Sequence, residues 1–126
     1  MEMTKTVLYV EDSQDNRTLV RRVLQSEGFQ VIEAEDATTA MQAIHGHQPD
    51  LILMDINLPE VDGYSLTSHL KLRPELRNVP IIALTANVMR GDRERSLDAG
   101  CDGYIQKPID VDAFAEQIEQ FIPRKR

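Results

Sequence analysis

The chain contains one cysteine, no apolar run long enough to cross a bilayer, and no surplus of basic residues. Cys101 therefore cannot form an internal disulfide. A membrane-spanning helix needs roughly 20 apolar residues in succession, and the N-terminus lacks the basic and then apolar regions of a signal peptide. The formal net charge of -7 provides no basic surface for binding phosphates. These absences indicate a cytoplasmic protein that binds neither nucleic acid nor membrane.

The composition is typical of one globular domain. With 126 residues, of which 41% are hydrophobic and 28% charged, the chain is long enough to bury a core. We find no internal repeat, low-complexity segment or interdomain linker. We expect a single domain over residues 5–123, with flexible termini at 1–4 and 124–126.

Five apolar, strand-like runs alternate with segments that carry helical spacing. The strand-like runs are 5–10, 30–34, 51–54, 80–84 and 103–106. The helical segments run from the cap Ser13 to Gly28, from the cap Asp36 to Gly46, from Gly63 towards Pro74, from about Val88 to Ala99, and from Asp110 to Pro123. This alternation predicts an α/β fold, with a five-stranded parallel sheet between five helices. Right-handed crossovers leave few topologies, and the order 2-1-3-4-5 is the common doubly wound solution.

The apolar positions of two helices predict which faces are buried. The first helix has an apolar stripe, so its arginines are expected to face solvent. The stripe consists of Val20, Val23 and Leu24, and the arginines are Arg17, Arg21 and Arg22. The final helix is expected to begin at Asp110 and to bury Val111, Phe114, Ala115, Ile118 and Ile122.

Polar side chains stand at the ends of four of the predicted strands. Glu11 and Asp12 follow the first strand, Asp55 the third, Thr85 the fourth and Lys107 the fifth. The carboxyl ends of parallel strands share one edge of the sheet, where α/β folds place ligands, so these side chains should converge. Asp55 alone could be a residue that merely starts a turn. The polar residues at the other strand ends favour a functional site that includes Asp55.

The residue types at these strand ends point to phosphoryl transfer. Three carboxylates on adjacent strands repel one another unless a cation lies among them, and oxygen ligands of this kind suit Mg²⁺. A carboxylate beside the metal can attack phosphorus and become an aspartyl-phosphate. Thr85 and Lys107 would then contact the phosphoryl oxygens. No glycine-rich phosphate loop occurs, so a nucleotide is not the implied ligand.

With these residues in this order, the sequence resembles the receiver domain of bacterial two-component response regulators, in the CheY-like superfamily. The resemblance spans residues 7–122 and is carried by Glu11-Asp12, by 54–63 around Asp55, by Leu84-Thr85-Ala86 and by Lys107-Pro108. It implies that Asp55 accepts a phosphoryl group from a histidine kinase or a histidine phosphotransfer protein. It also implies that Asp12, Asp55 and the backbone carbonyl of Asn57 ligate Mg²⁺, with Glu11 acting mainly through water.

The resemblance assigns roles to three further residues. Thr85 matches the switch hydroxyl and Lys107 the phosphate-binding lysine. Tyr104 matches an aromatic switch residue that moves inward when the hydroxyl closes on the phosphoryl group, although an aromatic in a strand is usually part of the core. The Lys107–Pro108 peptide bond is expected to be cis by resemblance.

The same resemblance implies a signalling switch and not an enzyme, limited to Mg²⁺-dependent self-phosphorylation from a donor and self-dephosphorylation. The fourth helix, fifth strand and fifth helix should present the output surface to a downstream protein target. The chain is expected to be a monomer or a phosphorylation-dependent dimer. Residues 89–92 and 99–101 make it similar to stand-alone DivK-type regulators. A piece of a longer or hybrid protein would look the same.

Two other function classes are weighed against this interpretation. A receiver-like adaptor would recognise partners without being phosphorylated, but the intact acidic set argues against it. A small phosphatase with an aspartyl-phosphate intermediate needs a second acidic residue two positions after the nucleophile, where Asn57 stands.

The histidines and the cysteine have simpler explanations than chemistry. His45 and His47 could suggest a metal pair, but their position at a helix end favours solvated side chains. His69 is predicted to lie on the surface of the third helix, and Cys101 to be a small buried residue.

Overall fold

The structure is a computed structural model, which describes residues 4–56, 58, 62–85 and 92–122. Within these residues the strands are β1 (Thr6–Val10), β2 (Gln30–Ala34), β3 (Leu51–Asp55), β4 (Ile81–Thr85) and β5 (Gly103–Gln106). The helices are α1 (Gln14–Ser26), α2 (Ala37–Gly46), α3 (Gly63–Lys71), α4 (Asp92–Ala99), α5 (Phe114–Phe121) and a 3-10 turn, η1 (Pro74–Leu76). All pairings are parallel and the order is β2-β1-β3-β4-β5, which confirms the predicted topology.

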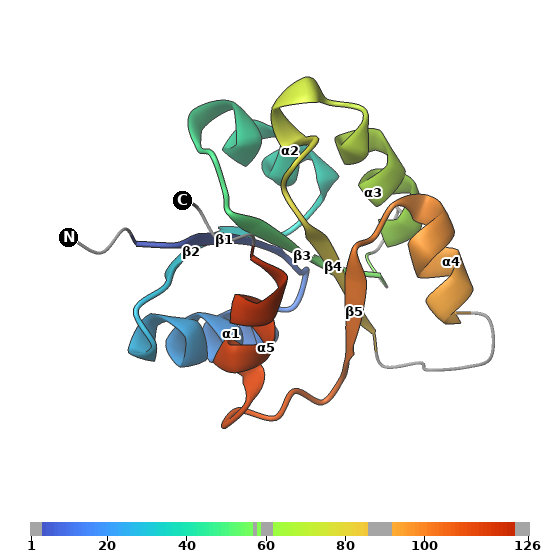
Figure 1. Ribbon diagram of the computed structural model, residues 1–126. Coiled ribbons are helices and arrows are strands. Elements are labelled where there is room, and N and C mark those ends of the chain that lie inside the picture. Colours follow the sequence, from blue (N-terminus) through green and yellow to red (C-terminus); the bar gives the residue numbers. More distant parts are fainter. Residues whose placement is uncertain (1–3, 57, 59–61, 86–91, 123–126) are drawn as a thin grey trace.

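The sheet lies between two layers of helices (Figure 1). One face packs against α1 and α5, and the other against α2, α3 and α4. Side chains alternate between the two cores along β3: Leu51 and Leu53 belong to the α1–α5 core, and Ile52 and Met54 to the other. All five residues of β3 are buried, as expected for the central strand of a sheet covered on both faces. This rigid strand carries Asp55 at its carboxyl end.

Helix caps lie where the sequence predicts them. Ser13 caps α1, with its side chain accepting a hydrogen bond from the backbone N–H of Asn16, and Gly28 follows α1 with a φ of +90°, which favours glycine. Asp36 caps α2 and forms a reciprocal capping box with Thr39. These local signals mark where α1 begins and ends and where α2 begins.

The last helix begins later than predicted. Residues 110–113 form a turn in which the N–H of Asp112 donates to Asp110 Oδ1 at 3.0 Å, and α5 starts at Phe114. Val111 is consequently 50% exposed and does not belong to the core face, whereas Phe114 and Ile118 are fully buried. Ile122 is partly buried against the same core. For the fourth helix, the predicted start at 88–91 lies outside the described residues.

Cys101 lies at the seam between α3 and the segment that follows α4. Its thiol is 4% exposed and lies 3.9 Å from the hydroxyl of Thr67, which confirms the prediction of a small buried residue. Burial raises the pKa of the Cys101 thiol above its usual value. Lys71 closes the seam by donating to Asp102 Oδ2 at 2.7 Å.

No helix among the described residues is long and apolar enough to span a membrane.

Candidate functional site

The strand register brings the predicted polar residues to one edge of the sheet. Val10 pairs with Met54, Asp55 with Leu84, and Thr85 with Gln106, so the ends of β1, β3, β4 and β5 lie side by side. The ammonium group of Lys107 reaches across this edge. Its Nζ lies 3.1 Å from Glu11 Oε1 and 3.6 Å from Asp55 Oδ1.

Three carboxylates form a compact group at this edge. One oxygen each of Glu11, Asp12 and Asp55 lies within 4.8 Å of the others. Glu11 and Asp55 are buried, while Asp12 is exposed, so the group opens to solvent on the Asp12 side. Three carboxylates this close, with one lysine between two of them, fit a hard divalent cation that takes oxygen ligands and retains water.

Glu11 is held by four donors. Its Oε1 accepts hydrogen bonds from the hydroxyl of Tyr9 at 2.9 Å, from Lys107 at 3.1 Å and from Asn16 Nδ2 at 3.4 Å, and its Oε2 accepts from the N–H of Ser13 at 3.3 Å. Burial is the largest influence on the pKa of Glu11 and would raise it, but hydrogen bonds with Asp55, Lys107 and Tyr9 together lower it to about 2. Glu11 is therefore ionised at neutral pH.

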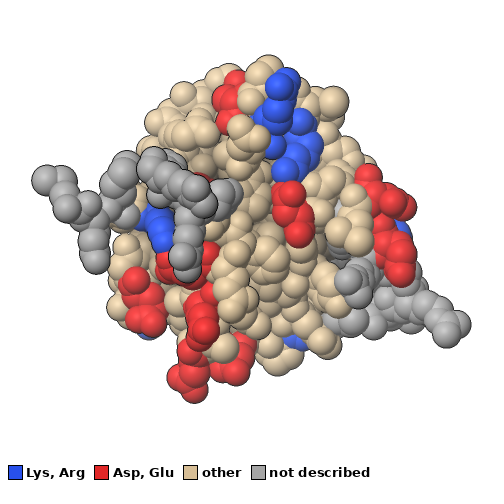
Figure 2. Space-filling model, in the orientation of Figure 1, with Lys and Arg blue, Asp and Glu red and all other residues tan. Residues whose placement is uncertain are grey.

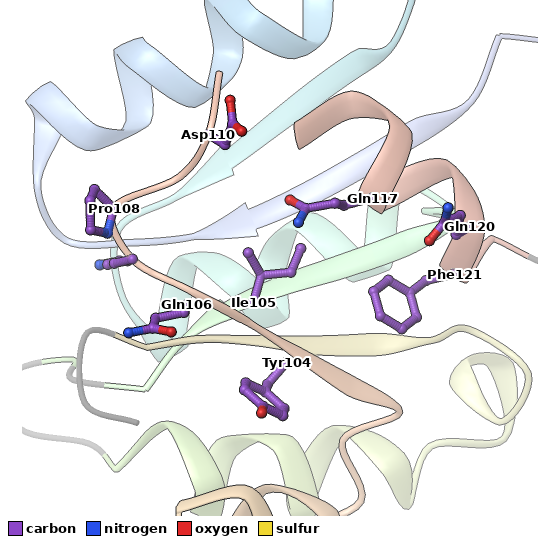
Figure 3. Close-up of a pocket in the computed structure, with 9 residues that line it drawn as sticks. Tyr104, Ile105, Gln106, Pro108, Asp110, Gln117, Gln120 and Phe121 are labelled. Carbon is purple, nitrogen blue, oxygen red and sulfur yellow. The ribbon is translucent and has the colours of Figure 1, made fainter. Parts of the chain in front are cut away.

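Thr85 ends β4, and Tyr104 lies on the neighbouring strand β5 in register with Ala83. Thr85 is buried, and its carbonyl accepts a hydrogen bond from the N–H of Lys107 at 2.8 Å, which ties the lysine to the end of β4. Tyr104 is partly buried and packs against the core beneath α2–α4. It projects from β5 on the side opposite Ile105 (Figure 3). The Lys107–Pro108 peptide bond is cis.

A glycine brings α3 against the end of β3. A Cβ on Gly63 would lie 2.7 Å from the carbonyl oxygen of Asp55 and 2.7 Å from Ile56 Cα. Only glycine fits this approach, since both contacts are with backbone atoms. Asn57, whose carbonyl is a predicted metal ligand, lies outside the described residues, as do 59–61 and 86–91.

Tyr9 lies at the site, although the sequence did not predict it there. Tyr9 belongs to the first apolar run and is fully buried, yet its hydroxyl binds Glu11. Burial, and then the charge of Glu11, raise the pKa of Tyr9 far above its usual value, so the phenol remains a donor. A buried tyrosine usually finds a partner for its hydroxyl, and this was the available signal.

Arg17 contradicts the prediction that it faces solvent. Its side chain is only 14% exposed, and Nη1 donates to the carbonyl oxygens of Glu11 at 2.8 Å and of Asp12 at 3.0 Å. The predicted outward orientation holds for Arg22, which is exposed, and partly for Arg21, whose side chain is 36% exposed.

The histidines lie away from the site. His45, His47 and His69 are exposed. In the part of the chain that the structure describes, Glu11, Asp12 and Asp55 form the only group of acidic, histidine or cysteine side chains placed to hold a metal, and neither His45 nor His47 belongs to one. The alternative of a histidine metal pair is thus not supported.

Comparison with known proteins identifies the family. The sequence model of the response regulator receiver domain family matches residues 7–119 of the chain. The chain belongs to this family. Receiver domains are signalling switches of two-component systems rather than enzymes in the usual sense, which leaves the phosphatase alternative without support.

Known receiver proteins resemble the chain over nearly its whole length. It is 45% identical over 120 residues to the polar-differentiation response regulator DivK of Brucella ovis, covering 95% of this chain and 98% of that one. It is 37% identical, with a TM-score of 0.85, to the receiver domain of a sensor histidine kinase from Pseudomonas aeruginosa, covering 94% and 98% of the two chains. That structure is described with a magnesium ion coordinated in its active site cleft. The chemotaxis response regulator CheY4 of Vibrio cholerae, with a TM-score of 0.89, 23% identity and coverage of 95% and 100%, shares the fold.

Proposed function

We propose that this chain is a phosphorelay response regulator in which Asp55 accepts a phosphoryl group from a histidine kinase or a histidine phosphotransfer protein. The observation that carries the proposal is the placement of the Asp55 carboxylate. It is buried among Glu11, Asp12 and Lys107, with one oxygen 3.6 Å from the lysine ammonium. Phosphoryl transfer mainly requires positioning and neutralisation of charge, and this set supplies both.

The proposed metal ligands are Asp12, Asp55 and the backbone carbonyl of Asn57, with Glu11 acting through water. The carboxylate oxygens within 4.8 Å of one another support the roles of Asp12, Asp55 and Glu11. The role of Asn57 is proposed from the family resemblance. Mg²⁺ bound here would neutralise the carboxylates and the oxygens of an incoming phosphoryl group.

In the proposed reaction a carboxylate oxygen of Asp55 attacks the phosphorus of a phosphohistidine. The new O–P bond forms as the P–N bond breaks, and the departing imidazole nitrogen takes up a proton. Lys107 then faces the negative oxygens of the acyl phosphate as a point charge. The hydroxyl of Thr85 is proposed to donate to one of those oxygens, and Tyr104 to follow it inward. Water attack on the acyl phosphate would reset the switch.

The readout is proposed to pass through the surface of α4, β5 and α5 to a downstream protein. Figure 2 shows acidic side chains gathered over the region of α1 and α5, and Glu27, Glu116 and Glu119 line a hollow between these helices. This charge argues against nucleic acid or an anionic membrane as the partner, and the proposal of a protein partner rests on the family resemblance. A cytoplasmic location, and a monomer or a phosphorylation-dependent dimer, are parts of the same proposal.

The test is phosphorylation with a small donor. Incubation with Mg²⁺ and acetyl phosphate should add one phosphoryl group to the wild type, detected by intact mass. The Asp55→Asn variant and a sample with excess EDTA should both remain unmodified. Uptake that persists unchanged in Asp55→Asn would contradict the assignment. Equal affinity of wild type and Asp55→Asn for a partner, whatever the donor, would favour the adaptor alternative.

A further inference from the structure

Arg17 forms an unusual link between helix α1 and the loop that carries two of the acidic residues. One of its terminal nitrogens, Nη1, donates to two successive backbone carbonyls, those of Glu11 and Asp12, at 2.8 and 3.0 Å. Both carbonyls belong to the short connection between β1 and α1. The contact therefore fixes the peptide planes from which the Glu11 and Asp12 side chains extend.

The guanidinium group is itself held from the other side. Its Nε lies 3.3 Å from Glu33 Oε1, and Glu33 is the register partner of Tyr9 on the neighbouring strand β2. Arg21, one turn further along α1, donates to the other oxygen of Glu33 at 2.6 Å. Arg17 is thus oriented by a carboxylate outside the acidic group, and its planar fork suits contacts in two directions.

The loop needs such a restraint because its side chains repel one another. One oxygen each of Glu11, Asp12 and Asp55 lies within 4.8 Å of the others, and Asp12 is exposed, so repulsion favours moving its carboxylate away from the other two. Among the described residues, three other side chains restrain Glu11 rather than Asp12: Tyr9, Lys107 and Asn16 all bind the Glu11 carboxylate. Arg17 is the side chain that reaches the backbone of Asp12.

We infer that Arg17, anchored by Glu33, is a positioning residue that holds the Glu11–Asp12 backbone so that the acidic group is preorganised for a divalent cation. This inference rests on the proposed metal site. It differs from a purely structural link between α1 and β2, which Arg21 also provides through Glu33.

Arg21 therefore offers a matched control. Arg17→Met and Arg21→Met each remove one ion pair with Glu33, but only Arg17→Met releases the loop carbonyls. In a Mg²⁺ titration followed by calorimetry, Arg17→Met should weaken binding roughly 10- to 100-fold, the range found when residues that support metal ligands are removed. Arg21→Met should bind close to the wild-type value. Equal affinities for the two variants would overturn the inference.

A second measurement needs no metal. The N–H of Ser13 donates to Glu11 Oε2, so its hydrogen exchange in EDTA reports the order of this loop. Exchange at Ser13 should be roughly five- to tenfold faster in Arg17→Met than in Arg21→Met, corresponding to loss of about one hydrogen bond. Unchanged exchange would overturn the positioning role even if the metal site is confirmed. Conversely, a wild type that binds no Mg²⁺ would contradict the proposed function, and the exchange comparison would still decide the role of Arg17.

Arg17→Lys distinguishes the effect of the guanidinium contacts from the effect of the positive charge. It also tests the inference if Arg17→Met does not fold. Lysine keeps the positive charge but not the fork that reaches Glu33 and both carbonyls, so Mg²⁺ binding should again weaken. Wild-type affinity in Arg17→Lys would show that charge alone suffices and would overturn the inference.

Discussion

The β1–α1 side of the molecule and helix α4 lie on opposite faces of the sheet (Figure 1), and their side chains are held in different ways. On the β1–α1 side, Tyr9 and Leu24 are fully buried, and Glu11 is surrounded by donors. On α4, no described side chain is buried, and Leu97 is 52% exposed.

Two contacts that join α4 to its neighbour α3 each have one exposed partner, Arg95 in the first and Ser68 in the second. The guanidinium of Arg95 lies 4.7 Å from the ring centroid of Tyr64, and the hydroxyl of Ser68 donates to the carbonyl of Ala99 at 3.0 Å. Elements with few buried contacts open at low free-energy cost. The difference indicates that α4 opens at a lower free-energy cost than the β1–α1 side of the molecule.

The largest expected effect is on stability, from the same substitution in the two regions. Leu24→Ala in α1 should lower the free energy of unfolding by about 2–5 kcal/mol, because it leaves a cavity in a packed core. Leu97→Ala in α4 should change it by less than about 0.5 kcal/mol, since that side chain is half exposed. Urea unfolding measures both. A comparable loss in the two variants would show that α4 is packed as firmly as α1.

Removal of Lys107, which contacts Glu11 and Asp55, tests whether the acidic group carries out the phosphorylation. Lys107→Met should slow phosphorylation of Asp55 by acetyl phosphate roughly 100-fold, because the charge facing the phosphoryl oxygens is lost. Intact mass at successive times gives the rate. Lys5→Met is the control, since Lys5 pairs with Glu119 at the opposite edge of the sheet. A wild-type rate in Lys107→Met would contradict the role of the lysine.

The hydroxyl of Tyr9 gives a smaller, pH-dependent effect. Glu11 has a folded-state pKa of about 2, below its ordinary 4.5, so its contribution to stability is present above pH 4.5 and is lost as the pH falls towards 2. Tyr9→Phe removes one donor and moves the pKa of Glu11 back towards its ordinary value. Without metal, the variant should be about 1–2 kcal/mol less stable than wild type at pH 7.

That difference should shrink at pH 3, because the unfolded-state titration is common to both proteins and Glu11 takes up a proton more readily in the folded variant, where its pKa is higher than in the folded wild type. Urea unfolding at the two pH values checks the sign. Tyr104→Phe is the control, because the hydroxyl of Tyr104 makes no hydrogen bond to the acidic group among the described residues. An equal loss for Tyr9→Phe at both pH values would show that Glu11 is not the partner that matters.

The smallest expected effect concerns the surface contact of α4. A double-mutant cycle with Arg95→Met and Tyr64→Leu should give a coupling of about 0.5–1 kcal/mol, typical of a cation–π pair whose cation is exposed to solvent. A coupling well above that range would mean that α4 is bound to α3 more tightly than its exposure indicates.

Much of the fold could be predicted because its signals are local. Apolar runs identified the strands, and Ser13, Asp36 and Gly28 marked helix ends through bonds or backbone angles within a few residues. The predicted start of α5 at Asp110 was wrong. The hydrogen bond from the Asp112 N–H to the Asp110 side chain can cap a helix, but it also forms in an isolated turn, as it does here. A sequence does not distinguish the two.

The candidate site was predictable as a set of strand ends, but not the residues that support it. Asp55, Thr85 and Lys107 were found because parallel strands deliver their ends to one edge. Arg17 was assigned to solvent by helical periodicity, since a long side chain that folds back along its own helix leaves no periodic signal. The partner of Tyr9 depends on how its ring lies in the packed core, which periodicity does not report.

The single thiol, at the seam between α3 and the segment that follows α4, can report how often that seam opens. Cys101 is shielded from solvent beside Thr67, and its raised pKa keeps it in the unreactive thiol form. A thiol reagent can therefore modify it only during moments when the seam parts. The rate at which Cys101 is labelled therefore reports how often this seam opens. Comparing the rate before and after phosphorylation needs no probe added to the chain.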